Sequence, residues 1–292
     1  MTNEHSGFLL LDKPENWSTF DLIRDLRKKI SMRKLGHTGT LDPFATGLVI
    51  LCLGKATRLS SLLLDQDKEY LAEMELGSRT DTGDISGVTI ENKSIPSISD
   101  KMFTEAVKEI KNITIQTPPR YSAIKIKGKP AYKLAREGKE FDLTERMVKI
   151  HSFEICSFQN NVIVYRTKVS KGTYIRTLTE DFAELLGSVA FTRALRRISI
   201  GNIDVGQAVR PEEINETNWQ DYLIPINTIL RDYPHIILSG DQLALFFNGN
   251  KILLPPAEYP SEVLVFNASD KKECIGWGII KERVLHPRKV FK

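Results

Sequence analysis

The sequence predicts an α+β protein that ends in a small all-β module. Short apolar runs and alternating apolar–polar segments, both typical of strands, recur through the first part of the chain and are interleaved with amphipathic helix patterns. Over about the last sixty residues only short strand-like pieces remain, separated by Gly, Asn and Pro. Together these observations indicate a unit built of both strands and helices, followed by a small all-β unit.

The first two elements are a buried strand and a capped helix. Residues 8–11, Phe-Leu-Leu-Leu, form an apolar run that ends before Pro14. Ser18 can cap a helix, because Asp21 follows three residues later as in a capping box, and apolar residues recur at helical spacing over 23–30. The far face of this helix and the loop after it are basic, which fits either a solvated surface or a phosphate-binding one. The basic residues are Arg24, Arg27, Lys28, Lys29, Arg33 and Lys34.

Residues 48–53 predict a fully buried strand or a short core helix, and they lead into Gly54-Lys55-Ala56-Thr57. The Gly-Lys pair suggests a P-loop. However, six residues separate Gly47 from Gly54 where the motif has four, and Ala56 occupies the position of the required hydroxyl. Nucleotide hydrolysis is therefore excluded.

The middle of the chain alternates between strands and helices. Residues 69–77 place Tyr70, Ala72, Met74 and Leu76 on one face of a half-buried strand, and residues 79–84 predict a polar loop. A helix is expected over 100–111, a strand over 162–169, and a helix from about residue 175 that Gly187 ends. Arg176 at the start of that helix opposes the macrodipole. Either an anionic partner or a solvent-exposed side chain would explain it.

Strand-like pieces at 236–238, 263–266 and 274–280 make up the predicted C-terminal module. The pattern changes between Pro225 and Pro234, which is typical of a short linker. We therefore expect two units, residues 1–230 and 231–292.

Composition excludes several classes of protein. The net charge of +4 permits a nucleic-acid partner without requiring one. Cys52, Cys156 and Cys274 lack metal-ligand spacing and are expected to be small core residues in a reducing compartment. No signal peptide and no membrane helix are expected, and this predicts a cytosolic protein.

Residues 36–47, Gly-His-Thr-Gly-Thr-Leu-Asp-Pro-Phe-Ala-Thr-Gly, contain three glycines and a proline and cannot form the interior of a helix or strand. Asp42 is the only acidic residue between Arg33 and Asp65. A lone carboxylate on a rigid turn is a candidate nucleophile or general base. It can equally be an aspartate that caps the next turn.

Residues 120–149 carry nine Lys and Arg against four Asp and Glu, and they include Tyr121, Tyr132 and Phe141. Cations and aromatic rings in this mixture suit RNA, because the cations meet phosphates and the rings stack on unpaired bases. Gly128 and Gly138 favour a loop. A mobile surface excursion is the simpler interpretation and is compatible with RNA binding.

The segment around Asp42 resembles the catalytic motif of the bacterial TruB-type tRNA pseudouridine-55 synthases, and further motifs follow in the family's order. Thr40 and Phe44 depart from the pattern of many relatives without removing a reactive group. The likeness is strong over about residues 7–200 and weaker in the tail, where Phe247-Asn248-Gly249 and Gly276-Trp277-Gly278 resemble a PUA RNA-binding domain. The other matching segments are Leu10–Pro14, Asp67–Tyr70, Arg79–Thr82, Pro119–Ala123, Lys171–Thr177 and Leu195–Arg197.

The resemblance implies a mixed, mainly antiparallel curved sheet flanked by helices, with the active site in a central cleft and a PUA-like domain at the end. It also implies isomerisation of one T-loop uridine of tRNA, at position 55, to pseudouridine. That reaction needs no metal and no cofactor. The resemblance further implies a cytoplasmic enzyme that acts as a monomer, without an obligatory protein partner, and folding assistance to tRNA can accompany catalysis.

Site residues follow from the same resemblance. Asp42 would be the catalytic carboxylate, Arg176 would pair with it, and Tyr70 would stack on the uracil. Tyr174 and Leu195 would line the uracil pocket, and His37 would fill the space that flipped bases vacate. The remaining roles are support of the catalytic loop by Lys13 and Pro14, and a grip on the T-arm by a thumb-like insertion, residues 120–150, that includes Lys133 and Arg136.

Three other functions compete with this one. A catalytically silent RNA-binding or tRNA-folding protein would bind tRNA without isomerising it. An RNA-guided synthase of the same superfamily would need a guide RNA and partner proteins, whereas the basic insertion favours a stand-alone enzyme. A glycoside hydrolase would need a second carboxylate near Asp42, and the sequence shows no acidic pair there.

Overall fold

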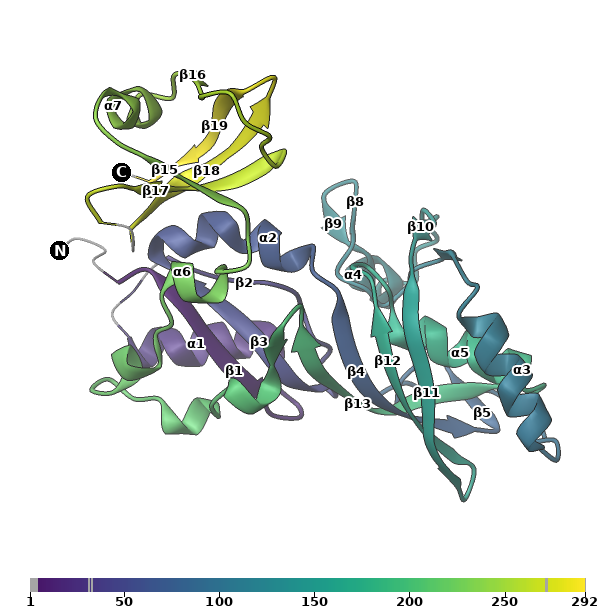
Figure 1. Cartoon of the computed structure of the whole chain (residues 1–292). Helices are drawn as coiled ribbons and strands as arrows, with labels where there is room; N and C mark the ends of the chain where they lie inside the picture. The colour runs from purple at the N-terminus through teal and green to yellow at the C-terminus, as the bar shows by residue number, and fades with distance from the viewer. Residues whose placement is uncertain (1–4, 31, 33, 271–272, 292) are drawn as a thin grey trace.

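A mixed sheet in the order β1-β3-β13-β4-β12-β11 runs through the larger part of the molecule, with β2 and β14 pairing off this path (Figure 1). The computed structural model describes residues 5–30, 32, 34–270 and 273–291, so Arg33 of the predicted basic cluster lies outside the described residues. Within the described part, the pairs of this sheet are antiparallel except β3–β13, which is parallel. This confirms the expected mixed, mainly antiparallel sheet. The strands are β1 Gly7–Lys13, β2 Leu35–His37, β3 Thr46–Leu53, β4 Lys68–Leu76, β11 Ile150–Gln159, β12 Val162–Val169, β13 Ala190–Ile200 and β14 Ile203–Asp204.

Strands β1 and β3 are buried on both faces, which explains why their sequences read as continuous apolar runs. Leu9 and Leu11 face the core shared with the helices, whereas Phe8 and Leu10 face a second core. Residues 48–53, for which strand and helix were both open, therefore form a strand. Residues 54–57 begin a 3-10 helix, η1 Gly54–Leu59, which is followed by a short α-helix, α2 Ser60–Leu64.

Helix α1 (Thr19–Lys29) begins as predicted. The Ser18 hydroxyl accepts a hydrogen bond from the Asp21 backbone N–H, and the Asp21 carboxylate accepts one from the Ser18 N–H. Helices α3 (Asp100–Ile110) and α5 (Ile175–Leu185) also lie where the periodicity placed them. All three contribute apolar side chains to the same core cluster.

Strands β4 and β12 confirm the predicted strands, and alternate residues of β4 are buried. The strand character of β11 was not predicted. It lies at the edge of the sheet, where most of its side chains are exposed. Its Cys156 is exposed, so the expectation of three buried cysteines holds only for Cys52 and Cys274.

The polar loop 79–84 is partly structured, because β5 (Ser78–Thr80) pairs with β6 (Thr89–Asn92). Short elements also occur in the basic segment 120–150, which was expected to be loop-like. Lys127 and Gly128 adopt positive φ in the turn that joins β8 to β9, as a tight hairpin requires. The elements here are β8 Lys125–Ile126, β9 Lys129–Pro130, α4 Ala131–Arg136 and β10 Arg146–Met147, and β10 pairs with β7 Ile115–Gln116, which precedes the segment.

The C-terminal module contains a five-stranded sheet in the order β15-β17-β18-β19-β16. It carries in addition a short helix, α7 Asp241–Phe247, which the sequence analysis did not predict. Phe8 and Leu10 of β1 share a core cluster with Leu264 and Phe266 of the module, so the two sheets are joined by apolar contacts. The strands are β15 His235–Leu238, β16 Ile252–Leu253, β17 Glu262–Asn267, β18 Cys274–Lys281 and β19 Val284–Val290, and α6 Ile226–Ile229 precedes them.

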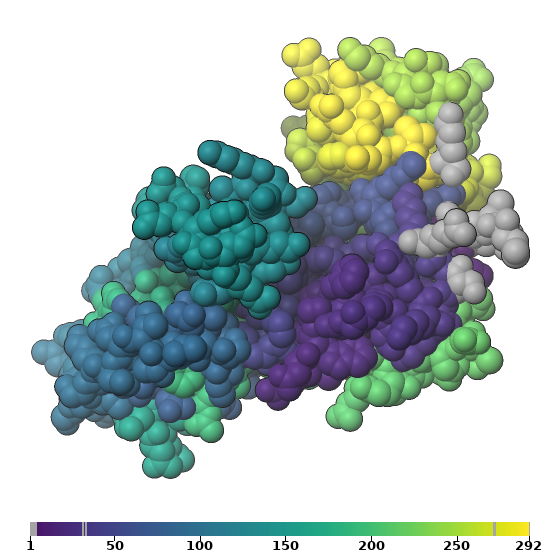
Figure 2. Space-filling view, turned by 180° about the vertical axis from the view of Figure 1, so that it is seen from behind, coloured from purple at the N-terminus to yellow at the C-terminus, as the bar shows by residue number. Residues whose placement is uncertain are grey.

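Figure 2 shows this module and the teal insertion as two lobes that stand out from the rest of the surface. None of the helices in the described part of the chain is long and apolar enough to cross a membrane.

The parallel contact between β3 and β13 depends on Gly47. A Cβ atom there would lie 2.3 Å from the Arg197 carbonyl oxygen and 2.7 Å from its nitrogen, and φ is +104°. The two strands can approach only because Gly47 has no side chain.

We predict that Gly47→Ala destabilises the protein by more than about 4 kcal/mol, since it adds a backbone overlap to an unfavourable φ. Gly128→Ala is the matched control. Its φ is +85° but nothing lies within 4 Å of the added Cβ, so it should cost only about 1–2 kcal/mol. Urea unfolding followed by circular dichroism measures both variants, and equal losses would contradict the steric argument.

Candidate active site

A cavity of about 420 Å³ lies where the loop before β3 meets β4, β13, the start of α5 and the basic insertion. Its size is in the range of small-ligand sites. Five of the residues predicted from sequence line it: Asp42, Tyr70, Tyr174, Arg176 and Leu195. The chain thus brings together residues that are up to about 150 positions apart.

The backbone on both sides of Asp42 is tied to the N-terminal segment. The Leu41 N–H donates to the hydroxyl of buried Thr19 over 2.9 Å. The Pro43 carbonyl accepts hydrogen bonds from the Asn16 N–H at 2.8 Å and from Lys13 Nζ at 3.1 Å. The position of Asp42 is therefore set by contacts of its neighbours.

Lys13 is fully buried and its ammonium group also donates to the carbonyls of Pro14 and Trp17. Burial lowers the pKa of Lys13 to about 8, although the nearby Asp42 carboxylate opposes this. Lys13 is thus in contact with the loop that carries Asp42. Pro14 lines a different hollow, together with Asp12 and Arg196.

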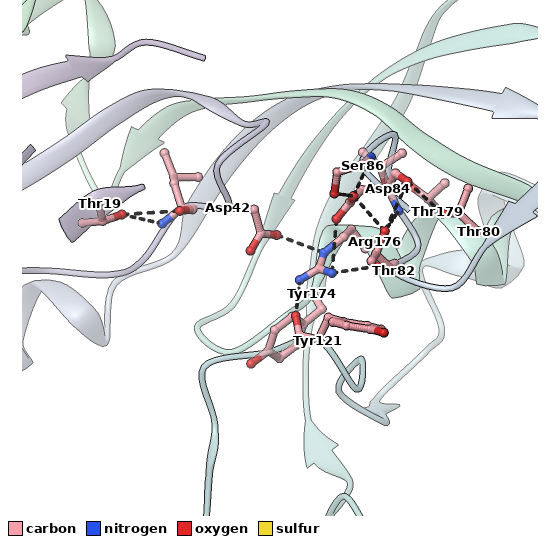
Figure 3. Close-up of polar contacts among 12 residues, drawn as sticks. Thr19, Asp42, Thr80, Thr82, Asp84, Ser86, Tyr121, Tyr174, Arg176 and Thr179 are labelled. Atoms are coloured by element: carbon pink, nitrogen blue, oxygen red, sulfur yellow. Dashed lines mark hydrogen bonds and ion pairs between the residues drawn. The ribbon is translucent and has the colours of Figure 1, made fainter. Parts of the chain in front are cut away.

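Arg176 lies in the first turn of α5 and its side chain is only 4% exposed. Its Nε is 2.9 Å from Asp42 Oδ2. Nη1 donates to the Thr82 carbonyl at 2.7 Å and Nη2 to the Tyr121 carbonyl at 2.9 Å (Figure 3). Arg176 thus has an anionic partner, Asp42, which offsets the unfavourable placement of a positive charge at a helix N-terminus.

Asp84 is a second carboxylate of this network, and the sequence analysis missed it. Its Oδ2 lies 3.4 Å from Arg176 Nη1, and its side chain is 6% exposed. Oδ1 accepts hydrogen bonds from the Thr82 hydroxyl at 2.9 Å and from the Ser86 N–H at 3.0 Å. The cluster of Thr, Asp, Gly and Ser over 80–87 signals a turn of this kind, but only the tertiary contact reveals its link to Arg176.

Asp42 itself is 35% exposed and faces the cavity. Loss of hydration raises the pKa of the Asp42 carboxyl above its ordinary value. Arg176 and Lys13 oppose the rise, and the Asp84 carboxylate adds to it. The pKa of Asp42 is therefore raised, whereas the ion pair with Arg176 alone would lower it.

The walls of the cavity come from paired strands and from the start of α5. Tyr70 on β4 is 9% exposed and Leu195 on β13 is 7% exposed. Tyr174 is held through its backbone, because its N–H donates to Gln116 Oε1 at 2.7 Å and its carbonyl accepts from Gln116 Nε2 at 3.2 Å. Gln116 was not predicted, and burial raises the pKa of the Tyr174 hydroxyl.

Five of the predicted residues do not line this cavity: Lys13 and Pro14, whose contacts are given above, and His37, Lys133 and Arg136. His37 lies on β2, where its Nδ1 accepts a hydrogen bond from the Gly39 N–H at 3.2 Å and burial lowers its pKa. Lys133 and Arg136 are exposed on α4. Conversely, three cations line the cavity that the sequence analysis did not assign to it: Lys68, Arg146 and Arg197.

We predict that Asp84→Asn shifts the titration of Asp42 to lower pH, because it removes the negative charge that helps to raise the pKa of Asp42. Titration of the carboxyl ¹³C signal of Asp42 measures this. Asp81→Asn is the control, since Asp81 lies in the same turn but contacts Val88 and Tyr121 instead of Arg176. An unchanged or higher pKa of Asp42 in the Asp84 variant would contradict the shared network.

Comparisons with known proteins show the family to which this chain belongs. Residues 27–175 match the TruB family pseudouridylate synthase (N terminal domain). The tRNA pseudouridine synthase B of Hydrogenovibrio crunogenus is 36% identical over 287 residues, which cover 98% of this chain and 93% of that protein. The same-named protein of Aquifex aeolicus is 34% identical over 288 residues, with 98% and 99% covered.

Among solved structures, an H/ACA RNP bound to a substrate RNA containing 2'-deoxyuridine superimposes with a TM-score of 0.72. It covers 98% of this chain and 85% of that one at 20% identity, so it supports the fold alone. Because the relatives named above exceed 30% identity along nearly the whole chain, the protein belongs to the TruB family of pseudouridylate synthases.

Proposed function

We propose that this protein isomerises the uridine at position 55, in the T-loop of tRNA, to pseudouridine. The observation that carries the proposal is the Asp42–Arg176 ion pair at a cavity of about 420 Å³, which has room for a uridine. It lies in a chain whose relatives, along nearly their full length, are named tRNA pseudouridine synthase B.

The chemistry requires a carboxylate next to the ribose. The bond between C1′ and N1 breaks, the uracil turns, and C5 bonds to C1′; C5 then loses its proton and N1 takes one up, so the product is an isomer of uridine. Asp42 would start this sequence by attack at C1′, by attack at C6, or by removal of a ribose proton to give a glycal. Arg176 would orient the carboxylate in each case. No redox change occurs, and we expect no metal or cofactor.

The cavity walls would hold the base. Tyr70 would stack on the uracil, and Tyr174 and Leu195 would enclose it. A uridine inside a folded loop must first be extruded, at a cost of a few kcal/mol. His37 ends β2 and accepts a hydrogen bond from Gly39, in the segment that leads to Asp42. It would fill the space that the extruded base leaves in the RNA.

RNA outside the cavity would be gripped by the basic insertion. The Tyr121 carbonyl accepts a hydrogen bond from Arg176 at one end of this segment, and Arg146 lines the cavity at the other, so both ends of the insertion border the site. Lys133 and Arg136, on its exposed helix, would contact phosphates. The PUA-like unit, residues 231–292, would bind RNA beyond the T-arm. We expect a cytosolic monomer that needs no protein partner.

The competing functions are less well supported. A glycoside hydrolase needs two carboxylates at the substrate, but Asp84 does not line the Asp42 cavity in the described part of the chain. The RNA-guided alternative is supported only by a similarity in fold to the H/ACA RNP structure, at 20% sequence identity. A silent tRNA-folding protein would not require the Asp42 carboxylate, paired with Arg176, to face a cavity.

We predict that Asp42→Asn lowers pseudouridine formation by at least ~1,000-fold and leaves tRNA affinity close to wild type. An unmodified tRNA transcript is incubated with each protein, and pseudouridine is mapped by carbodiimide labelling and primer extension. Asp25→Asn, on a carboxylate of α1 that pairs with Lys29, is the control. A wild-type protein that binds tRNA but gives no stop in the T-loop would refute the proposed activity.

Binding should also depend on salt through the insertion. Lys133→Ala with Arg136→Ala should reduce the slope of log Kd against log salt by about 1.5, at roughly 0.7–0.9 for each lost phosphate contact. The matched control is Lys101→Ala with Lys108→Ala, two exposed lysines of α3. Filter binding between low and moderate salt measures both, and equal slopes would remove α4 from the RNA interface.

A further inference from the structure

Lys68 is a buried cation at the candidate active site whose place in the reaction is unassigned. It is the first residue of β4, and the alternation of that strand puts it on the same buried face as Tyr70. The residue is 7% exposed and lines the cavity that contains Asp42. A lysine in this position needs partners, because burial of an ammonium group is unfavourable.

Two of its three N–H groups have partners. Nζ donates to the Leu64 carbonyl at 2.5 Å and to the Gln66 carbonyl at 2.6 Å, at the end of α2. These bonds brace the α2–β4 connection and orient the ammonium. Within the described residues, Nζ has no third hydrogen-bond acceptor and no carboxylate within ion-pair distance.

The nearest charges do not neutralise Lys68. Arg197, from β13, and Lys171, from the loop before α5, repel it, while Asp65 and Asp67 attract it from the turn before β4. Both carboxylates are engaged elsewhere, since Asp65 lies 2.9 Å from Lys171 Nζ and Asp67 lies 3.1 Å from His151 Nε2. The charge of Lys68 therefore remains available to an anion that enters the cavity.

Resting on the proposed function, we propose that Lys68 binds a phosphodiester flanking the flipped uridine through its third N–H. An extruded nucleotide carries phosphates on both sides of its ribose, and Asp42 must meet that ribose. A charge fixed by two carbonyls on the cavity wall would hold the backbone while the base turns. Lys68 would thus be a substrate-binding residue, beyond its contact with α2.

The protonation state of Lys68 gives the proposal a second signature. Burial lowers the pKa of Lys68 to about 8, with Arg197 adding to the fall and Asp65 and Asp67 opposing it. The ammonium therefore loses its proton as the pH rises through about 8, and attraction to a phosphate is lost with it. A bound phosphate in turn favours the charged form.

The test compares RNAs that differ by one charge. T-arm stem-loops carry either a phosphodiester or a neutral methylphosphonate at the linkage 5′ or 3′ to the target uridine, with identical 2′-deoxy residues in each pair. At one linkage, wild-type protein should lose ~10- to 100-fold in affinity on methylphosphonate substitution, as for a hydrogen bond to a charged group. Lys68→Met should bind the phosphodiester RNA as weakly and show no further loss.

Lys171→Met is the matched control, because it removes a neighbouring positive charge that is 58% exposed and does not line the cavity. This variant should retain the methylphosphonate penalty. If Lys68→Met instead loses as much affinity on methylphosphonate substitution as the wild type does, the two penalties are additive. That result would overturn the phosphate contact and leave Lys68 with a structural role at the end of α2.

If Lys68→Met fails to fold, the pH dependence of RNA binding by the wild-type protein still tests the proposal. In the wild type the methylphosphonate penalty should shrink as the pH rises above about 8, and a penalty that is constant with pH would overturn the proposal. The same preparation is assayed on the all-ribose stem-loop. No pseudouridine there would refute the proposed function itself, whereas an active enzyme with additive penalties would refute only the role of Lys68.

Discussion

Arg176 buries a full positive charge in the interior, and much of the site is arranged to satisfy it. Its guanidinium contacts the Asp42 loop, the turn that holds Thr82 and Asp84, and the Tyr121 carbonyl at the start of the basic insertion. A buried guanidinium without these partners would be strongly destabilising. The ion pair therefore holds three segments, far apart in the chain, in one arrangement around the cavity.

The other buried cations act in a similar way. Lys13, Lys68 and Arg197 all donate to main-chain carbonyls, and each of these contacts fixes a loop next to the cavity. Arg197 bonds the Leu48 and Gly39 carbonyls on either side of the Asp42 loop. Backbone carbonyls satisfy these side chains without cancelling their charge, and two of them, Lys68 and Arg197, line the cavity and place positive charge on its wall. Such a wall suits a polyanionic substrate.

Local patterns predicted much of the fold. The capping box at Ser18 and the alternation of β4 are determined by neighbours in sequence, and both elements lie where expected. Hydrophobic periodicity did not predict two elements, β11 and α7. Strand β11 at the sheet edge exposes most of its side chains, and α7 is a single short helix within a β module, so neither shows a clear period.

The sequence by itself determined which residues are candidates for the site, among them Asp42, Tyr70 and Arg176, because a motif is recognised by residue type and spacing, and these three residues line one cavity. Only the tertiary structure decided that Asp84 shares Arg176, that Gln116 clamps Tyr174, and that Lys68 faces the cavity. These contacts join segments whose separation in the chain carries no periodic signal. The direction of the Asp42 pKa shift was also decided there, because it depends on burial and on the summed field of three charged groups, Arg176, Asp84 and Lys13.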